Sequence, residues 1–409
     1  MKCRHCNAAL TLPFLDLGSA PPSNAYLSEA SLRAPEIWFP LRLLVCQRCW
    51  LVQTEDHAGR EALFTDDYAY FSSFSTSWLA HSQAYVRTMR ERFALGAGSL
   101  VAEIAANDGY LLQYVKAAGI PCYGVEPTAS TAAAARAKGI AIIERFFSVA
   151  LADELVQQGK AVDLVAANNV LAHVPDINDF VGGFTRLLKP QGVTTFEFPH
   201  LLQMIQHCQF DTAYHEHYSY LSLTAVARVF AANGLCIFDV EEHPTHGGSL
   251  RVLAQRLDTG AHLCSPSVTR MLERETSAGL TSPAAYAGFQ AQAERVKNDF
   301  IAFLVDAKRQ GKRVAAYGAA AKGNTLMNFA GVRPDLLSFV VDRNPAKAGK
   351  FMPGSRIPIV GEERLRQDKP DYIVILPWNL KTEVVAQLDY ARAWGASFVT
   401  AVPRLEVMR

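Results

Sequence analysis

Apolar and polar positions along the 409-residue chain change their pattern near residue 99, and this change marks the predicted centre of the fold. Short apolar segments at 100–104, 122–126 and 162–167 alternate with stretches of helical spacing, such as 110–118 and 131–138. Strands that alternate with helices in this way predict βαβ units, which build a parallel sheet. Ligands of such a sheet bind at the carboxyl ends of its strands.

The C-terminal third repeats this pattern after a long predicted helix. Residues 284–310 are expected to form a helix that joins two domains, because large apolar residues recur at helical spacing: Tyr286, Phe289, Val296, Phe300, Phe303 and Leu304. A strand from Arg313, a strand ending at Asp342 and a third over 372–376 predict a second Rossmann-like unit. It lacks both Gly-x-Gly-x-x-Gly and Gly-Lys-Ser/Thr, which argues against a second redox cofactor.

Composition narrows the class of protein. Half of the residues are apolar and 19% are charged, as in a well-packed enzyme. The 40 basic and 39 acidic side chains leave a net charge of +1, which provides no basic field for nucleic acid.

The N-terminus has no apolar signal region, and no stretch approaches the ~18 to 20 apolar residues of a membrane span. We therefore expect a cytoplasmic protein with neither a nucleic-acid nor a membrane partner.

Two Cys-x-x-Cys pairs predict a structural zinc site. Cys3 and Cys6 form one pair and Cys46 and Cys49 the other, so together they offer the four thiolates of a tetrahedral Zn²⁺ site. His5 is a competing ligand. A redox role for either pair would need a βαβ setting, which this proline-rich segment lacks.

The first and second strands of the central unit end in a pattern that favours S-adenosylmethionine. An acidic residue that closes the second strand is placed to accept hydrogen bonds from ribose hydroxyls. A dinucleotide would need a Gly-x-Gly-x-x-Gly turn for its pyrophosphate, whereas S-adenosylmethionine carries no phosphate. The expected cofactor contacts lie in the first turn, at the end of the second strand and after the fourth: Glu103, Ala105, Asn107, Gly109, Tyr110, Glu126, Pro127, Asn168 and Asn169.

The run Tyr214-His215-Glu216-His217-Tyr218 predicts acid/base chemistry. No helical or strand period buries five such side chains in succession. A metal site is the weaker interpretation, because His-x-His supplies two ligands, and a structural polar network is the other alternative. We expect His217 to act as the base, Glu216 to orient it or neighbouring hydroxyls, and Tyr214 to donate to a keto or enolate oxygen.

Two further segments are candidates for substrate contact. Residues 66–75 are too polar for a core helix and too aromatic for a plain linker, so they are expected to face a ligand or to form a packed hinge. Adjacent glycines in the segment after residue 245 allow a close backbone approach to a sugar or its phosphate. The expected substrate contacts from these two segments are Tyr70, His246, Gly247, Gly248, Ser249 and Arg251.

Several segments of the chain carry a family resemblance. They are, in chain order, the two cysteine pairs, "VAEIAANDGYLLQY", "GVEP", "ANNVLAHVPDINDFV", "LLKPQGVTTFEFPHL", "QFDTAYHEHYSYLSL" and "THGGSLRV". Together they resemble the sugar C-methyltransferases that act on nucleotide-linked 4-keto deoxyhexoses. The resemblance covers essentially the whole chain. Ala106 departs from it, since a serine is common there in the family, and this weakens one cofactor hydrogen bond.

The resemblance implies an α/β fold in three parts. These are a zinc-binding domain with a substrate-facing linker over 1–75, a class I Rossmann-like methyltransferase domain over 76–265, and a Rossmann-like domain with its connecting helix over 266–409. It supports Tyr214, Glu216 and His217 in the site and adds Tyr68 and His173 as lining groups. It also places Lys322 at a helix N-terminus, where a diphosphate would bind.

The implied reaction transfers a methyl group from S-adenosylmethionine to C3 of a 4-keto-deoxyhexose through an enolate, which makes a branched-chain deoxysugar. The expected nucleotide is dTDP, and the expected state is a monomer or weak homo-oligomer. Two alternatives remain open at this point. One is a nucleic-acid methyltransferase that docks through a zinc ribbon, and the other is a non-enzymatic zinc scaffold that keeps the fold.

Overall fold

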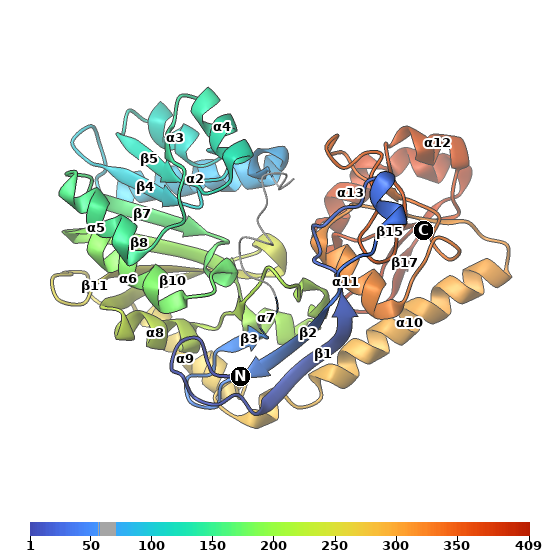
Figure 1. The fold of residues 1–409 in the computed structure, drawn as a ribbon, viewed down its shortest axis with the longest axis horizontal. Coiled ribbons are helices and arrows are strands. Elements are labelled where there is room, and N and C mark those ends of the chain that lie inside the picture. The colour runs from blue at the N-terminus through green and yellow to red at the C-terminus, as the bar shows by residue number, and fades with distance from the viewer. Residues whose placement is uncertain (56, 58–70) are drawn as a thin grey trace.

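The computed structural model describes residues 1–55, 57 and 71–409, and these form three sheets. Figure 1 shows the central α/β domain and the C-terminal α/β domain on either side, with the first strands of the chain between them at the bottom. Tyr68 and Tyr70 lie outside the described residues. No helix in the described part of the chain has the length and apolar character needed to cross a bilayer.

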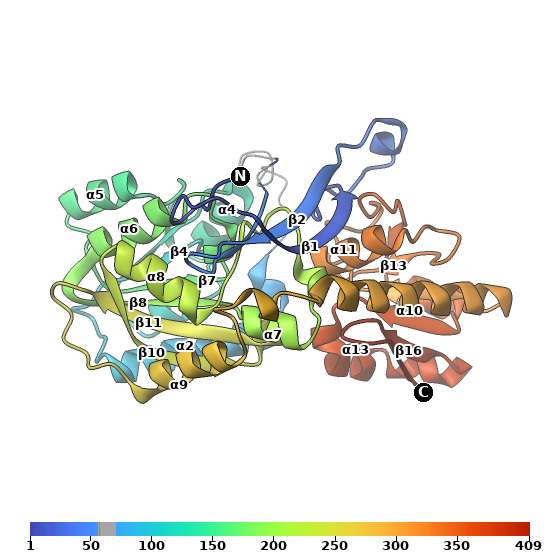
Figure 2. The same cartoon turned by 90° about the horizontal axis from the view of Figure 1, so that it is seen from below.

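The N-terminal sheet has four antiparallel strands and includes one from far along the sequence. Its order is β1 (Leu12–Ala20), β2 (Phe39–Val45), β3 (Val52–Thr54) and β9 (Ser219–Tyr220). Because β9 directly follows the Tyr-His-Glu-His run, this pairing fixes the run against the N-terminal domain. The loop between β1 and β2, which contains η1 (Ala30–Arg33), extends over the C-terminal domain (Figure 2), where Leu27 and Phe351 exchange backbone hydrogen bonds of 2.9 and 2.8 Å.

The central sheet is doubly wound, as the strand and helix pattern predicts. Its order is β10-β11-β8-β7-β4-β5-β6, and β11 alone runs antiparallel within it. The chain reverses its winding direction between β4 and β7, so the ligand crevice is expected at their carboxyl ends. The strands are β4 (Val101–Ile104), β5 (Cys122–Val125), β6 (Ala141–Ile143), β7 (Val162–Asn168), β8 (Leu188–Pro199), β10 (Leu235–His243) and β11 (Ser249–Arg256).

Helices cover both faces of this sheet (Figure 1). They are α2 (Thr76–Arg92), α3 (Leu112–Ala117), α4 (Ala129–Ala137), α5 (Val149–Gln157), α6 (Ile177–Leu187), α8 (Leu223–Ala232) and α9 (Pro266–Ser277). The short α7 (Leu201–Gln206) follows β8. Although α9 begins after residue 265, it packs on β10 and α8 of the central domain.

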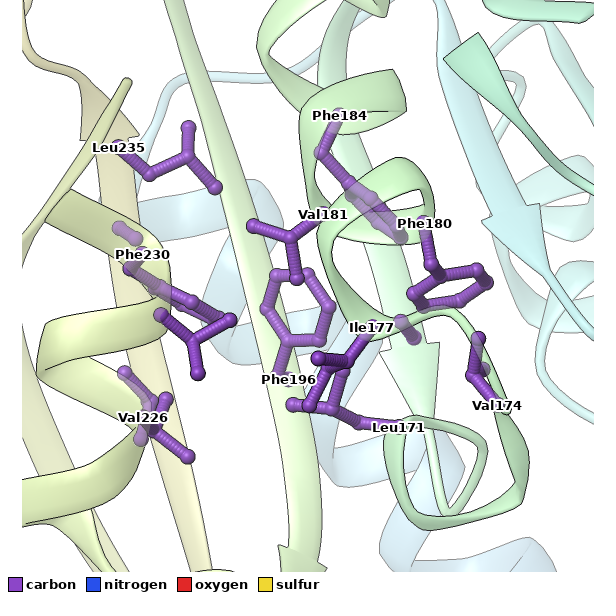
Figure 3. Close-up of a cluster of buried hydrophobic side chains, with 14 of the residues drawn as sticks. Leu171, Val174, Ile177, Phe180, Val181, Phe184, Phe196, Val226, Phe230 and Leu235 are labelled. Carbon is purple, nitrogen blue, oxygen red and sulfur yellow. The ribbon is translucent and has the colours of Figure 1, made fainter. Parts of the chain in front are cut away.

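An aromatic core fixes the strands that carry the site. The helix α6 turns Phe180 and Phe184, four residues apart, to the same side, and both are buried (Figure 3). The ring of Phe196 on β8 lies 4.5 Å from Phe184 and 4.8 Å from Phe230 of α8. Burying side chains of this size stabilises the fold by about 1.5 to 3 kcal/mol each. The strand β8, which pairs with β7, is therefore packed against both α6 and α8.

The C-terminal domain confirms the predicted second Rossmann-like unit. The helix α10 (Phe289–Arg309) precedes a sheet of order β14-β13-β12-β15-β16-β17, which is parallel except for β17. Phe14 of β1 stacks on Phe289 at 4.5 Å, which ties the N-terminal sheet to this helix. The strands and helices are β12 (Val314–Tyr317), α11 (Ala321–Ala330), β13 (Val340–Val341), β14 (Ile359–Val360), α12 (Glu363–Asp368), β15 (Tyr372–Ile375), α13 (Lys381–Gln387), β16 (Ser397–Thr400) and β17 (Glu406–Met408).

Candidate active site

A cavity of about 370 Å³ lies where the three domains meet, at the carboxyl ends of the central strands. Many of the residues predicted from the sequence line it: Ala105, Asn107, Tyr110, Glu126, Pro127, Asn168, Asn169, His173, Tyr214, His217, His246 and Lys322. The sequence reasoning missed other lining residues, among them Asn24, Trp78, Arg145, Phe147 and Lys347. Arg145 and Phe147 directly follow β6, so the strand-end rule itself would have found them.

The first turn is shaped by Glu126, which follows β5. One carboxylate oxygen of Glu126 accepts the backbone N–H of Asn107 at 2.9 Å, and the other accepts that of Thr128 at 2.9 Å. Burial raises the pKa of this carboxyl group. Ala105 and Asn107 adopt left-handed φ angles of 59° and 48°, so the turn doubles back tightly beside the cavity.

Glu103 and Gly109 lie before and after the tightest part of this turn. Glu103 is fully buried within β4, and burial raises its pKa well above the usual range. Gly109 has a φ of 75°, and a Cβ there would lie 2.4 Å from Ile140. Neither residue is among those that line the cavity, so the structure does not bring these two predicted cofactor contacts to it.

Two amide oxygens of the cavity wall are left for a ligand, as expected of a binding site. The Oδ1 atoms of Asn168 and Asn169 are buried and have no hydrogen-bond partner among the described residues. The Nδ2 group of Asn169 lies 3.0 Å from Nε2 of His246. Burial lowers the pKa of His246 to about 4, so this ring is neutral. Unsatisfied amide oxygens beside the first turn fit a polar ligand such as S-adenosylmethionine.

Tyr214, His217 and His173 form an aromatic cluster on the wall. The ring centroids of Tyr214 and His217 are 3.9 Å apart, and those of His173 and His217 are 4.5 Å apart. Burial, together with the nearby His173, lowers the pKa of His217 well below 6.5. Burial lowers the pKa of His173 to about 4. Both imidazoles are therefore neutral near pH 7, and a neutral imidazole accepts a proton.

The neighbours of His217 in the run point elsewhere. Nε2 of His215 lies 3.2 Å from the Pro40 carbonyl of the N-terminal sheet. Glu216 is buried behind the wall, where Oε1 accepts hydrogen bonds from the backbone N–H and Nδ2 of Asn24. Burial raises the pKa of Glu216. The carboxylate thus contacts a wall residue that the sequence did not suggest.

Two lysines approach the cavity from the C-terminal domain. Lys322, in the first turn of α11, donates to Asn379 at 2.7 Å and lies 4.5 Å from the centre of the Trp378 ring. Burial lowers its pKa. Lys347 donates to the Ala319 carbonyl at 2.7 Å. Lys347 also lies 3.5 Å from a carboxylate oxygen of Asp342. The two lysines therefore bring amino groups to this side of the cavity, one of them beside a carboxylate.

The cavity that His246 lines is not lined by the glycine segment after it or by Arg251. Gly247, Gly248 and Ser249 line a separate cavity of about 320 Å³ beside His200. A Cβ on Gly247 would lie 2.5 Å from the Trp378 ring, so the close approach at this glycine is to the C-terminal domain.

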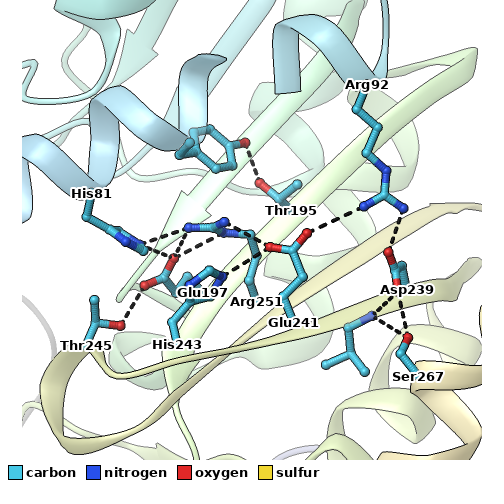
Figure 4. A network of polar contacts seen from close by, with 12 residues as sticks. His81, Arg92, Thr195, Glu197, Asp239, Glu241, His243, Thr245, Arg251 and Ser267 are labelled. Carbon is cyan, nitrogen blue, oxygen red and sulfur yellow. Dashed lines mark hydrogen bonds and ion pairs between the residues drawn. The ribbon is translucent and has the colours of Figure 1, made fainter. Parts of the chain in front are cut away.

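Arg251 belongs to a buried ion network (Figure 4). Its guanidinium donates to Glu197 at 2.7 Å and to Glu241 at 3.0 Å. Burial alone would raise the pKa of Glu197, but a hydrogen bond with His81 and the charge of Arg251 bring it to about 2. The other oxygen of Glu197 accepts Thr245, which fixes the loop that carries His246.

The four predicted cysteines converge on one point. Their sulfur atoms all lie within 4.8 Å of one another, with 3.5 Å between Cys3 and Cys49 and between Cys6 and Cys46. Zn–S bonds of about 2.3 Å in a tetrahedron place sulfur atoms about 3.8 Å apart, so the cluster fits zinc. His5 turns away and contacts Asn178 at 2.8 Å.

Three family models match consecutive parts of the chain. They are described as "Putative zinc binding domain" over 3–64, "Methyltransferase domain" over 78–240 and "C-methyltransferase C-terminal domain" over 244–403. The sheet order and these matches define a class I methyltransferase fold with a zinc-binding N-terminal domain, as predicted.

A curated relative identifies the family. C-methyltransferase NovU of Streptomyces niveus is 32% identical over 407 residues, which span 100% of this chain and 96% of NovU. The chain therefore belongs to this C-methyltransferase family and is an S-adenosylmethionine-dependent C-methyltransferase.

Solved structures also resemble part of the chain. A Burkholderia thailandensis 1,6-didemethyltoxoflavin-N1-methyltransferase is 17% identical with a TM-score of 0.38, covering 51% of this chain and 96% of that one. Magnesium protoporphyrin IX methyltransferase of Synechocystis PCC 6803 is 15% identical with a TM-score of 0.36, covering 50% of this chain and 100% of that one.

Proposed function

We propose that the enzyme methylates a nucleotide-linked 4-keto-deoxyhexose at C3, with dTDP as the nucleotide, and so makes a branched-chain deoxysugar. The observation that carries the proposal is the shared cavity. The Tyr214 and His217 pair lines the same space as Glu126 and Asn107, and Lys322 lines its C-terminal side. An acid/base pair, a cofactor turn and a wall that carries a lysine are what carbon methylation of a sugar nucleotide requires.

In this proposal the neutral imidazole of His217 takes the proton from the carbon next to the ketone. The electrons of that C–H bond pass into an enolate, and the hydroxyl of Tyr214 donates a hydrogen bond to its oxygen. When bound, S-adenosylmethionine supplies the electrophilic methyl group that the carbon then accepts. His217 is buried, and a hydrogen bond in surroundings of low dielectric constant is stronger than one in water.

The other wall residues orient the two ligands. Glu126, Asn168 and Asn169 present carboxylate and amide groups to the ribose and amino-acid parts of the cofactor. Lys322 lies in the first turn of a ten-residue helix, where a diphosphate gains both from its ammonium and from the helix N-terminus. His173 donates through Nδ1 to the Glu216 carbonyl at 2.8 Å, which fixes its ring against His217.

The test is turnover with matched acceptors. Purified enzyme and S-adenosylmethionine are incubated with dTDP-4-keto-6-deoxyglucose, and separately with its 4-hydroxy counterpart. We expect the keto sugar alone to gain a methyl group by mass spectrometry, because a hydroxyl does not acidify its neighbouring carbons. The ketone acidifies C3 and C5 alike, so NMR of the product decides the position. A methyl group on C5 would contradict the C3 assignment, and methylation of the hydroxy sugar would contradict the enolate.

A further inference from the structure

Asn24 belongs to the N-terminal domain, and its segment is hydrogen-bonded by both other domains beside the cavity. It lies in the loop between β1 and β2 and lines the cavity wall. From the central domain, Glu216 accepts its backbone N–H at 3.3 Å and its Nδ2 at 3.2 Å. From the C-terminal domain, Nδ2 of Asn324 donates to the carbonyl of the preceding Ser23 at 2.6 Å. The residue is thus held from two sides.

Glu216 organises the wall on both sides of His217. Its carbonyl accepts Nδ1 of His173, and its carboxylate accepts Asn24. The residue itself is only 1% exposed. Burying a carboxylate costs free energy unless hydrogen bonds compensate, and bonds to a charged acceptor are the stronger kind. The carboxylate is therefore suited to hold one amide in one orientation.

That orientation decides which atom of Asn24 is left for a ligand. Because the backbone N–H and the Nδ2 of Asn24 both point to Oε1 of Glu216, this oxygen is an acceptor and the side-chain amide presents its nitrogen to it. The amide carbonyl Oδ1 lies on the opposite arm of the planar group. A carbonyl oxygen accepts hydrogen bonds, so its complement is a hydroxyl and not a ketone.

We propose that Asn24 recognises the sugar ring of the acceptor, with Oδ1 accepting a hydrogen bond from a ring hydroxyl, and that Glu216 is the positioning residue that fixes this amide. The inference rests on the proposed function, since it takes a sugar nucleotide as the occupant of the cavity.

The contacts of the same loop link this recognition to the nucleotide side. Two residues on from Asn24, the Tyr26 hydroxyl donates to the Ala319 carbonyl at 2.6 Å. Ala319 precedes α11, whose first turn carries Lys322 on the cavity wall. A sugar held by Asn24 and a diphosphate held by Lys322 are therefore in fixed register relative to His217.

The experiment exchanges donor and acceptor within the pair. Calorimetry measures binding of dTDP-4-keto-6-deoxyglucose, dTDP and S-adenosylhomocysteine to the full-length wild type, Asn24→Ala, Asn24→Asp, and Asn24→Asp combined with Glu216→Gln. Asn24→Ala should weaken the sugar nucleotide about three- to tenfold, the usual effect of one neutral hydrogen bond, and leave dTDP and S-adenosylhomocysteine unchanged.

The double variant separates positioning from a general structural role. Asn24→Asp alone places two carboxylates together and should bind the sugar nucleotide less well than Asn24→Ala. Adding Glu216→Gln removes the repulsion between the two carboxylates, gives the aspartate an amide donor and leaves an aspartate oxygen for the hydroxyl. The backbone N–H of residue 24 then faces this amide nitrogen and loses the acceptor it has in the wild type. Affinity should then rise about threefold or more above that of Asn24→Asp but stay below wild type, since the side-chain hydrogen bond is restored and the backbone one is not. Asn298→Ala, at an exposed position of α10, is the matched control.

The outcomes distinguish this inference from the proposed function. Equal weakening of dTDP and the sugar nucleotide by Asn24→Ala, or a double variant no better than Asn24→Asp, would overturn the role of Asn24 alone. A wild type that binds the sugar nucleotide no more tightly than dTDP would overturn both, because no sugar subsite would then exist. Thermal unfolding of each variant shows that it is folded.

Discussion

Replacing His217 with asparagine tests the proposed base of the reaction. The imidazole is 8% exposed and packs between the rings of Tyr214 and His173, at centroid distances of 3.9 and 4.5 Å. Asparagine keeps a polar side chain of similar reach but has no basic nitrogen. The variant therefore removes the proposed proton acceptor while it leaves the cofactor turn untouched.

The expected loss follows from the role of a general base. Such a group contributes about 10²- to 10⁴-fold to rate, which equals about 2.7 to 5.5 kcal/mol in the activation barrier. We expect a loss within this range in both proton removal and methylation. Affinity for S-adenosylhomocysteine should stay within about twofold of wild type, because no hydrogen bond to it is removed.

Hydrogen exchange isolates the first step. In heavy water with dTDP-4-keto-6-deoxyglucose and S-adenosylhomocysteine, which has no methyl group to give, the wild type should exchange hydrogen for deuterium at C3, as NMR detects. Glu216→Gln should lose less than His217→Asn, because it positions neighbouring groups and removes no proton. Near-normal exchange in His217→Asn would move the base to Tyr214 or His173. No exchange in the wild type would refute enolate formation.

The pH profile of exchange checks the state of the imidazole. A base works in its neutral form, so exchange falls as pH drops through the pKa of the folded enzyme. Burial holds the pKa of His217 well below 6.5. Between pH 8 and 6.5 the exchange rate should therefore stay flat, and it should decline only below that. A decline centred at or above pH 6.5 would contradict the burial argument.

Three further perturbations have defined outcomes. Cys46→Ser with Cys49→Ser should abolish binding of one zinc per chain, and unchanged zinc by elemental analysis would contradict the site. Glu126→Ala should weaken S-adenosylmethionine binding by about 1.5 to 3 kcal/mol, the range for hydrogen bonds to a charged group, and calorimetry giving wild-type affinity would exclude that contact. Arg251→Met leaves the carboxylate of Glu197 buried without its cation and should lower the free energy of unfolding by about 3 to 5 kcal/mol, measured by urea unfolding. A loss of sugar-nucleotide affinity in that variant without destabilisation would instead favour Arg251 as a substrate contact.

The expected cofactor contacts could be placed together from the sequence because the pattern that points to them is local. Each strand of a βαβ unit and the turn after it are adjacent in sequence, and the parallel sheet brings those turns together. Glu126, Asn107, Asn168 and Asn169 consequently line one cavity. The cysteine pairs were equally readable, since ligand type and spacing alone define a zinc knuckle.

The other parts of the site depend on contacts between residues that are far apart in the sequence, and no local pattern predicts these contacts. Asn24 meets Glu216 across 192 positions of sequence, and only the folded arrangement of three domains joins them. Arg251 was expected to contact the substrate, but it lies directly opposite Glu197 in the antiparallel pair of β11 and β8. One sequence does not reveal that register, so a buried ion pair and a substrate arginine look the same.

The zinc site is connected by hydrogen bonds to the run that holds the proposed base. Next to the ligand Cys3, the backbone N–H of Arg4 donates to Gln53, and its guanidinium donates to the Thr54 carbonyl at 2.9 Å. The Thr54 hydroxyl in turn donates to the His217 carbonyl at 3.1 Å. The metal closes the two knuckles, the knuckles hold β3, and β3 holds the backbone of the proposed base. The zinc-binding domain, which looks separate in the sequence, therefore helps to position the proposed base.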